Sequence, residues 1–198
     1  MTLVCLDLEG VLIPEMWIRV AEETRIPELR LTTRDIEDYD ELMRHRLAIL
    51  HDRGITLPDI QAAIADVEPL DGGADFLRRL RHERQVVILS DTYIEFVRPV
   101  MAALGHPLIL CNELVTDEPG NVVDYRLRQQ DGKREAVTAF RSMNLKTVAV
   151  GDSFNDISMI RAADVGILFR PSDKVRAAHP DLEVAHDHAE LLAEILAL

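Results

Sequence analysis

One repeated pattern restricts the fold of this chain: short apolar runs that end in polar residues and alternate with helical stretches. Leu3-Val4-Cys5-Leu6 is the first such run, and Asp7-Leu8-Glu9-Gly10 follows it directly. A short apolar run bounded by turn residues is typical of a parallel strand that is buried on both faces. Open α/β sheets place their chemistry at the carboxyl ends of such strands. We therefore expect Asp7 and Glu9 to lie at a functional edge of a sheet.

Two acids as close as Asp7 and Glu9 repel each other unless a cation joins them. Oxygen ligands of this kind suit Mg²⁺, so the pair indicates a divalent metal and a charged substrate. Acids are also common turn residues after strands, and the pair alone would say little. Its weight comes from later strand ends that carry matching groups.

The second strand end is Ser90-Asp91-Thr92, which follows the apolar run Gln85-Val86-Val87-Ile88-Leu89. Small polar residues there can hold phosphate oxygens through hydroxyl and backbone N–H groups. An alternative is that Ser90, Asp91 and Thr92 cap the helix that is expected to start near Tyr93. The two roles are compatible, and the sequence leaves both open.

A third strand is expected over Lys146–Val150, and Gly151-Asp152-Ser153-Phe154-Asn155-Asp156 follows it. Helix capping needs one acid and has little use for two acids with Ser and Asn between them. Asp152 and Asp156 are therefore candidate metal ligands. Lys133 begins another helical pattern, and its ammonium would suit phosphate, although a Lys at that place in a helix is more often solvated.

Taken in order, Asp7-x-Glu9, Ser90, Lys133 and Gly151-Asp152-x-x-x-Asp156 resemble the four motifs of the haloacid dehalogenase-like hydrolase superfamily. Its phosphoserine phosphatase branch is the most similar, including enzymes that also transfer phosphate to homoserine. The runs Cys5–Leu12, Val86–Thr92 and Gly151–Ser153 carry this resemblance. Glu9 is a departure, because most phosphatases of the branch have Asp there, one methylene shorter.

The resemblance implies a magnesium-dependent phosphatase that acts on phosphoserine through an aspartyl phosphate, with homoserine as a second acceptor. The implied catalytic residues are Asp7 and Glu9, and the implied phosphate-binding residues are Ser90, Asp91 and Lys133. The metal would be held by Asp7, the Glu9 main-chain carbonyl, Asp152 and Asp156, and the rest of the substrate by Glu15, Arg46 and Asn155. For Arg46, a solvated helix arginine like Arg34 and Arg44 is an equally supported interpretation.

Composition limits the possible partners and compartments. The net charge of −13 argues against nucleic acid and anionic membranes, which bind positive surfaces. We find no stretch of roughly 20 apolar residues that would span a membrane. Asp7 and Glu9 interrupt the opening apolar run, so a signal peptide is not expected. The two cysteines, Cys5 and Cys111, show no metal-ligand spacing and favour the cytoplasm.

The periodicity predicts a doubly wound, mostly parallel α/β sheet with a small helical cap inserted after the first strand. We assign residues 1–13 and 73–198 to a catalytic core and residues 14–72 to the cap. The expected elements are helices over 14–23, 36–50, from 58, 74–82 and 93–104, strands over 86–89, 108–110, 147–150 and 165–168, a hairpin near 118–121, helices after Lys133 and Asp156, and a final helix. His186-Asp187-His188 is interpreted as solvated residues that cap that final helix.

Two other functions are compatible with these residues. A phosphatase for another small phosphomonoester, such as a sugar phosphate or a nucleotide, would keep the core chemistry and change only the cap contacts. A phospho-accepting signalling domain would also use Asp, a hydroxyl and Lys on a doubly wound sheet. The long helical insertion and the Asp152/Asp156 pair favour the enzyme. The sequence leaves the oligomeric state open.

Overall fold

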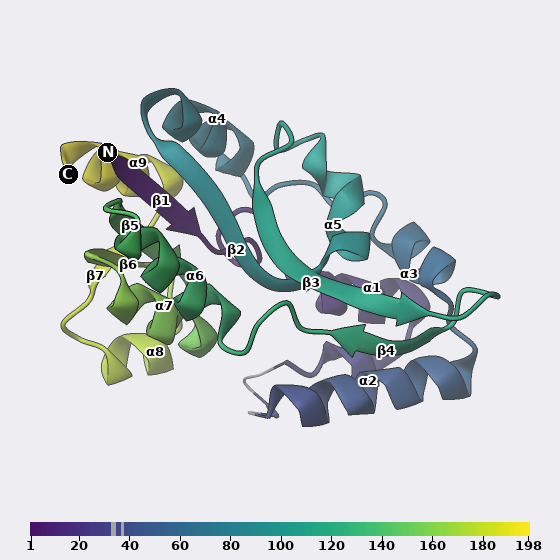
Figure 1. The fold of residues 1–198 in the computed structure, drawn as a ribbon. Helices are drawn as coiled ribbons and strands as arrows, with labels where there is room; N and C mark the ends of the chain where they lie inside the picture. The colour runs from purple at the N-terminus through teal and green to yellow at the C-terminus, as the bar shows by residue number, and fades with distance from the viewer. Residues whose placement is uncertain (33–34, 37) are drawn as a thin grey trace.

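The computed structural model describes residues 1–32, 35–36 and 38–198. In this described part of the chain, seven strands form one sheet in the order β4-β3-β2-β1-β5-β6-β7 (Figure 1). Their bounds are β1 Thr2–Leu6, β2 Gln85–Tyr93, β3 Ile109–Thr116, β4 Val122–Arg126, β5 Lys146–Gly151, β6 Val165–Phe169 and β7 Glu183–Ala185. The described strand pairs are parallel apart from β3 and β4. The predicted doubly wound, mostly parallel fold is confirmed.

Both faces of the sheet are covered by helices (Figure 1). One face carries α4 Gly73–Glu83, α5 Ile94–Met101 and α9 His188–Ala197, and the other carries α6 Gly132–Ser142, α7 Ile157–Ala162 and α8 Asp173–Ala178. Strand β1 shows why both faces must be covered: Val4 and Leu6 pack into one apolar cluster, and Leu3 and Cys5 into the other. Side chains of a strand alternate between faces, so a strand that is apolar throughout needs a layer on each side.

The connections place a crevice beside β1. The chain runs from β1 to β2 and β3 on one side, and later crosses to β5, β6 and β7 on the other. Ligands of open α/β sheets bind where the strand order reverses in this way, outside the carboxyl ends. Here that point lies between the ends of β1 and β5, which carry Asp7 and Asp152.

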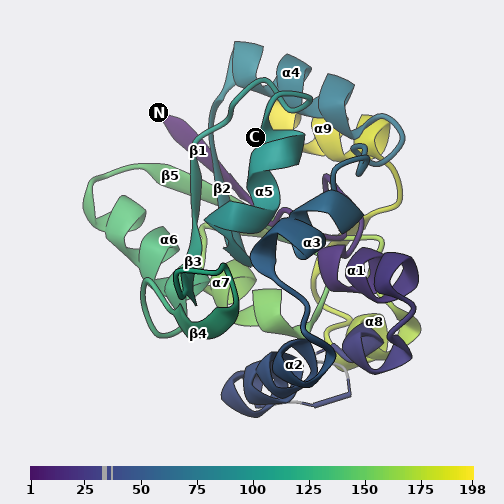
Figure 2. The ribbon, with the colours of Figure 1, turned by 90° about the vertical axis from the view of Figure 1, so that its right-hand side faces the viewer.

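A helical segment lies between β1 and α4, as predicted. It contains α1 Met16–Thr24, the 3₁₀ turn η1 Pro27–Arg30, α2 Tyr39–Arg53 and α3 Leu57–Ala63. Figure 2 shows these helices gathered together on one side of the sheet layer. Helix α3 contacts α5, and α2 contacts β4. Within the described residues, no helix is long and apolar enough to cross a membrane.

Several predicted bounds were wrong. Helix α2 begins at Tyr39 rather than Ile36, because the Asp38 side chain accepts a hydrogen bond from Glu41 N and caps the helix there. Strand β3 is longer than predicted because the β4 hairpin pairs with it through Thr116. Helix α5 ends at Met101, and the short elements α8 and β7 were missed, since three to six residues carry little periodic signal.

The interpretation of His188 as a solvated residue was also wrong. Its side chain is only 6 % exposed and packs beside the rings of Phe76 and Phe169, with centroids 5.2 and 4.7 Å away. Nδ1 lies 3.0 Å from the Asp71 carbonyl oxygen and Nε2 lies 2.8 Å from that of Val11. Carbonyl oxygens only accept, so a ring N–H directed at either of them makes a hydrogen bond. His188 thus joins the chain leaving β1 to the chain entering α4.

Replacing His188 with Ala should lower the free energy of unfolding by about 2–4 kcal/mol, because a buried carbonyl oxygen loses its donor and the packed ring leaves a cavity. Urea denaturation of the purified variant measures this. The matched control is His186→Ala, since His186 is exposed on the same turn, and a surface change of this kind stays within about 0.5 kcal/mol. Equal losses in the two variants would contradict the bridging role.

Candidate active site

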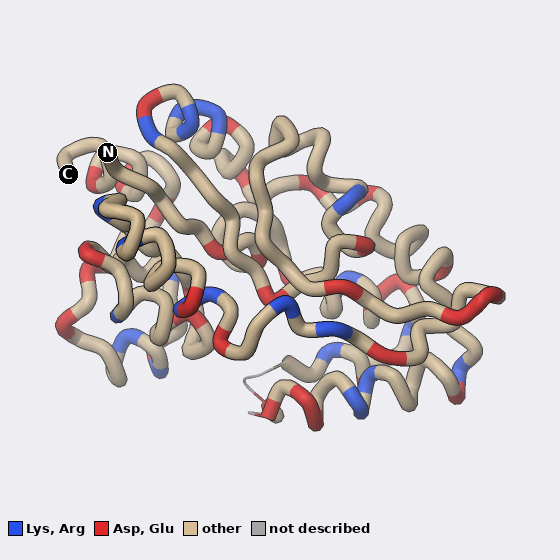
Figure 3. The backbone as a smooth tube through the Cα atoms, in the orientation of Figure 1, with Lys and Arg blue, Asp and Glu red and all other residues tan. Residues whose placement is uncertain are grey.

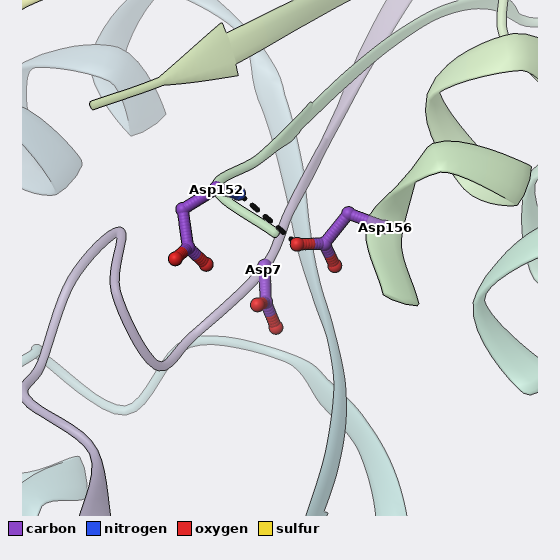
Figure 4. Close-up of side chains that lie close together, drawn as sticks. All are labelled: Asp7, Asp152 and Asp156. Carbon is purple, nitrogen blue, oxygen red and sulfur yellow. Dashed lines mark hydrogen bonds between the residues drawn. The ribbon is translucent and has the colours of Figure 1, made fainter. Parts of the chain in front are cut away.

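Three carboxylates from separate elements meet at the carboxyl edge of the sheet. Asp7 follows β1, Asp152 follows β5, and Asp156 ends the 3₁₀ turn η2 Phe154–Asp156. All three are buried, and one oxygen of each lies within 4.8 Å of the others (Figure 4). Strand β1 has no charged residue and is followed by acids, and the one charged residue of β2, Asp91, lies near its carboxyl end (Figure 3). Such a set of oxygen ligands matches a hard divalent cation such as Mg²⁺.

Two glycines allow this close approach. A Cβ on Gly10 would lie 2.5 Å from the Asp152 carboxyl carbon, and a Cβ on Gly151 would lie 2.3 Å from that of Asp156. Real Cβ atoms do not come so near to other atoms. Gly10 also has φ +82°, a backbone conformation that other residues rarely adopt. The turns after β1 and β5 are therefore built around the carboxylates.

Asp156 is oriented by its own turn. Its Oδ2 accepts hydrogen bonds from Asp152 N at 3.0 Å, Ser153 N at 3.1 Å and Ser153 Oγ at 3.1 Å. Its Oδ1 accepts from Lys133 Nζ at 2.7 Å. Because donors hold both of its carboxylate oxygens, Asp156 fixes the positions of Lys133 and of the Asp152 backbone. A role as a metal ligand would come in addition to these contacts.

Lys133 lies at the centre of the acids, so the alternative of a solvated surface lysine was wrong. Its side chain is 4 % exposed, and Nζ lies 2.9 Å from Asp7 Oδ1, 2.7 Å from Asp156 Oδ1 and 3.3 Å from Asp91 Oδ2. Burial acts to lower the pKa of Lys133, but the carboxylates of Asp156, Asp7 and Asp91 outweigh it and raise that pKa. The ammonium is therefore held in its charged form.

The site carries more negative than positive charge. Burial, and the nearby carboxylates of Asp156 and Asp152, raise the pKa of Asp7 although Lys133 acts in the opposite direction. One ammonium thus leaves the acids undercompensated. A divalent cation held by Asp7 and Asp152, with Asp156 close by, would supply the missing charge, so these residues fit Mg²⁺.

The Glu9 side chain contacts the start of the helical segment and strand β2. Its Oε2 accepts a hydrogen bond from Met16 N at 3.2 Å, at the start of α1, and its carboxyl group is hydrogen bonded to Glu15 and to the Thr92 side chain. Burial and the Glu15 carboxylate raise the pKa of Glu9 to about 8. A carboxyl group that keeps its proton at neutral pH is suited to act as an acid.

The segment Ser90-Asp91-Thr92 belongs to strand β2, so the alternative that it caps a helix was wrong. Strand β2 continues to Tyr93, which is the N-cap of α5 and makes no side-chain capping bond. Ser90 and Thr92 are buried and face the same cavity as Asp7. The Asp91 carboxylate contacts Lys133 and accepts a hydrogen bond from Asn155 Nδ2 at 3.1 Å.

Arg46 is buried, which rules out the solvated interpretation. Its side chain is 5 % exposed, its guanidinium lies 4.4 Å from the Trp17 ring centroid, and Nη2 donates to the Leu31 carbonyl oxygen at 2.8 Å. Nε has no hydrogen-bond partner among the described residues. Arg44 is 76 % exposed and paired with Asp40. Arg34 lies outside the described residues. A buried cation with an unsatisfied donor is suited to bind an anion.

A small cavity of about 80 Å³ joins these groups. It is lined by Asp7, Glu9, Glu15, Trp17, Thr32, Tyr39, Leu42, Arg46, Ser90, Asp91, Thr92, Tyr93, Lys133, Asp152, Ser153 and Asn155. Nine predicted site residues thus line one cavity, and the tenth, Asp156, is fully buried and contacts Lys133. Our sequence reasoning named Thr92 only as part of the segment Ser90-Asp91-Thr92, and it did not identify Tyr39 or Trp17 as site residues. It also missed Asn112, which donates to the Asp91 carbonyl, although a polar residue after the apolar run 108–110 was a usable signal.

Residues 1–164 match the family model of the haloacid dehalogenase-like hydrolases. The chain belongs to this family. It is therefore a hydrolase by family, and the signalling domain considered above is set aside. The order of its four motifs and the sheet topology agree with that assignment.

Curated relatives and a solved structure resemble the whole chain. A phosphoserine phosphatase of Pseudomonas syringae pv. tomato is 52 % identical over 192 residues, which cover 97 % of this chain and 81 % of that protein. Phosphoserine phosphatase ThrH of Pseudomonas aeruginosa is 48 % identical, covering 99 % and 96 %. The solved structure of a phospho-aspartyl intermediate analogue of a phosphoserine phosphatase superposes on this chain with a TM-score of 0.79. The two sequences are 21 % identical, and the match covers 98 % of each chain.

Mg²⁺ should raise the melting temperature of this hydrolase, because an ion that binds only the folded state stabilises it. Asp152→Asn should remove most of this increase, since an amide is a poor substitute for a carboxylate ligand. Thermal unfolding with and without Mg²⁺ measures both. Asp181→Asn, on the exposed Asp181–Arg161 pair, is the control and should keep the full response. An unchanged response in Asp152→Asn would contradict a metal site here.

Proposed function

We propose that this protein is a magnesium-dependent phosphoserine phosphatase that works through an aspartyl phosphate on Asp7. The main supporting observation is the buried contact between Asp7 and Lys133 at the end of the central strand, with Glu9, whose pKa is raised by burial and by Glu15, lining the same cavity. In this proposal Asp7 serves as the nucleophile, Lys133 as the cation and Glu9 as the acid around one small space. The similarity to curated phosphoserine phosphatases supports the same reaction.

In the first step, Asp7 attacks phosphorus and the bond to the substrate oxygen breaks. Asp7 Oδ1 accepts from Leu8 N at 2.8 Å and from Lys133, so we assign the attack to Oδ2. The Lys133 ammonium and the Ser90 hydroxyl hold the transferring phosphoryl group and offset its charge. Mg²⁺, when bound, would reduce the repulsion between the carboxylate and the phosphate. Glu9 gives its proton to the leaving oxygen.

In the second step, water replaces the leaving group. Glu9, now deprotonated, takes a proton from this water as the oxygen attacks phosphorus. The acyl phosphate bond breaks, inorganic phosphate leaves, and the carboxylate of Asp7 is restored. Glu9 ends the cycle with its proton, so the same side chain serves as acid and base. Hydrogen bonds with Met16 N and the Thr92 side chain hold the Glu9 carboxyl group in place for both proton transfers.

Recognition of the amino acid part would come from residues 14–72, which we propose act as a cap over a core of residues 1–13 and 73–198. The buried guanidinium of Arg46 would bind the substrate carboxylate, and Glu15 would bind the ammonium. Asn155, which already bonds Asp91, would contact the phosphoryl end. The cap would also exclude water until the leaving group is placed.

A sugar phosphate or nucleotide remains the alternative substrate class. A groove of about 830 Å³ adjoins the small cavity and shares Tyr39, Asp91, Lys133 and Asn155 with it. This groove would accept a larger organic part. The buried Arg46 favours phosphoserine, since most sugar phosphates have no carboxylate. We further propose a cytoplasmic location, which the free thiols of Cys5 and Cys111 support.

The decisive experiment is phosphate release from phosphoserine with Mg²⁺, compared with a panel of sugar phosphates and nucleotides. Asp7→Asn should abolish turnover and keep the fold, because an amide does not attack phosphorus. Circular dichroism verifies the fold of this variant. Appreciable turnover by Asp7→Asn would overturn the aspartyl phosphate, and a preference for sugar phosphates or nucleotides would overturn the substrate.

Arg46→Ala should raise the Michaelis constant for phosphoserine by about 10- to 100-fold, the value of a charge-assisted hydrogen bond. Phosphoethanolamine has no carboxylate, so its turnover should change much less. Arg44→Ala on the same helix is the matched control and should leave both substrates unaffected. If Arg46→Ala affects the two substrates equally, the carboxylate role is wrong.

Homoserine should compete with water as the phosphoryl acceptor, because Glu9 can deprotonate a hydroxyl as it does water. A bound alcohol in the cavity gains from proximity what water gains from concentration. Incubation with phosphoserine, Mg²⁺ and homoserine should therefore yield phosphohomoserine, measured by ³¹P NMR. If inorganic phosphate accounts for all the phosphoserine consumed at saturating homoserine, transfer does not occur.

A further inference from the structure

The three tyrosines of the chain meet at one point beside the site. Tyr39 begins α2, Tyr93 ends β2, and Tyr125 lies on β4. The ring of Tyr125 lies edge-on to those of Tyr39 and Tyr93, with centroids 6.0 and 6.4 Å away. Figure 1 shows α2 running alongside β4 at this place. The cluster therefore joins the helical segment to the sheet.

The hydrogen bonds within the cluster have one direction. Tyr39 OH lies 3.0 Å from the Asp91 carbonyl oxygen and 2.7 Å from Tyr93 OH. A carbonyl oxygen only accepts, so Tyr39 gives its single proton to Asp91 and accepts one from Tyr93. Burial raises the pKa of both phenols, which keeps these protons in place. The chain of bonds thus runs from Tyr93 through Tyr39 to Asp91.

Asp91 connects these hydrogen bonds to the residues proposed to bind phosphate. Its carbonyl oxygen also accepts from Asn112 Nδ2 at 3.0 Å, while its carboxylate contacts Lys133 and Asn155. The core supplies one donor to that carbonyl, through Asn112, and the helical segment supplies the other, through Tyr39. Asp91 therefore links α2 to Lys133: its main-chain carbonyl accepts from Tyr39, and its side-chain carboxylate contacts the Lys133 ammonium.

We propose that Tyr39 is a positioning residue that aligns the Asp91–Lys133 pair when α2 is seated against the sheet; this rests on the phosphatase function proposed above. Tyr39 does not take part in bond making. It sets the main chain of Asp91, and through it the carboxylate that helps to hold Lys133. Cap position and phosphate binding are coupled through this hydroxyl.

Three phenylalanine variants separate this role from simple packing, because each keeps the ring. Tyr39→Phe removes the donor to Asp91 and should lower kcat for phosphoserine about 3- to 10-fold. Tyr93→Phe leaves that donor in place and should have a smaller effect. Tyr125→Phe is the matched control, because it removes a hydrogen bond from β4 to Asp40 on α2 and leaves the contacts of Asp91 unchanged. Its kcat should stay within about twofold of that of the wild type.

A measurement independent of turnover completes the test. The dissociation constant of inorganic phosphate, by calorimetry with Mg²⁺, should rise by a similar factor in Tyr39→Phe and stay unchanged in Tyr125→Phe. Thermal unfolding separates a purely structural role: a lower melting temperature with unchanged kcat and phosphate affinity would overturn the proposal. So would equal effects of Tyr39→Phe and Tyr125→Phe.

The wild-type enzyme distinguishes this inference from the proposed function. If wild type binds phosphate but does not hydrolyse phosphoserine, the substrate assignment fails and Tyr39 is judged on phosphate affinity alone. If wild type binds no phosphate, the phosphate site is wrong and the positioning role is overturned with it.

Discussion

The contact of one buried ammonium with three carboxylates is the constraint on which this structure depends. Lys133 is held by Asp7, Asp91 and Asp156, each from a different part of the chain. Buried charges are tolerated only when they are paired and hydrogen bonded, so the strand ends that supply these acids must be placed together. The two glycines that let the turns approach, Gly10 and Gly151, follow from the same need. The remaining negative charge is what makes the site suitable for a divalent cation.

Much of the site could be predicted because its residues stand at the ends of strongly apolar runs. Asp7 and Asp152 follow strands whose side chains are buried on both faces, and parallel strands of one sheet have their carboxyl ends at one edge. Lys133 is different: nothing local distinguishes it from a surface lysine. Only its place in the order of motifs identified it, and the structure supplies the physical reason, since α6 begins with this side chain pointing at the acids.

The rest could not be predicted because it depends on contacts between distant segments. Strand β2 continues through polar residues to Tyr93, since β3 pairs with it there, and the sequence alone indicates a strand end at Leu89. His188 lies in a polar stretch of the chain, and it is buried by packing on Phe76, more than a hundred residues away in the sequence, and on Phe169. Tyr39 carries helical periodicity like any core residue. Its bond to Asp91 exists only because α2 is seated at the sheet edge.

The extra methylene of Glu9 allows the helical segment to shift the pKa of this carboxyl group. The longer side chain reaches the start of α1, where Met16 N donates to it and Glu15 shares a hydrogen bond with it. Burial and Glu15 raise the pKa of Glu9, and the backbone bond from Met16 acts in the opposite direction. Glu15 and Met16, which shift the pKa of Glu9, thus belong to the helical segment, whereas Asp7 follows β1 and Lys133 lies on α6. In the proposed reaction, a substrate ammonium that approached Glu15 would change the charge beside Glu9. Recognition of the amino acid and protonation of its leaving oxygen would then be coupled through one pair of carboxyl groups.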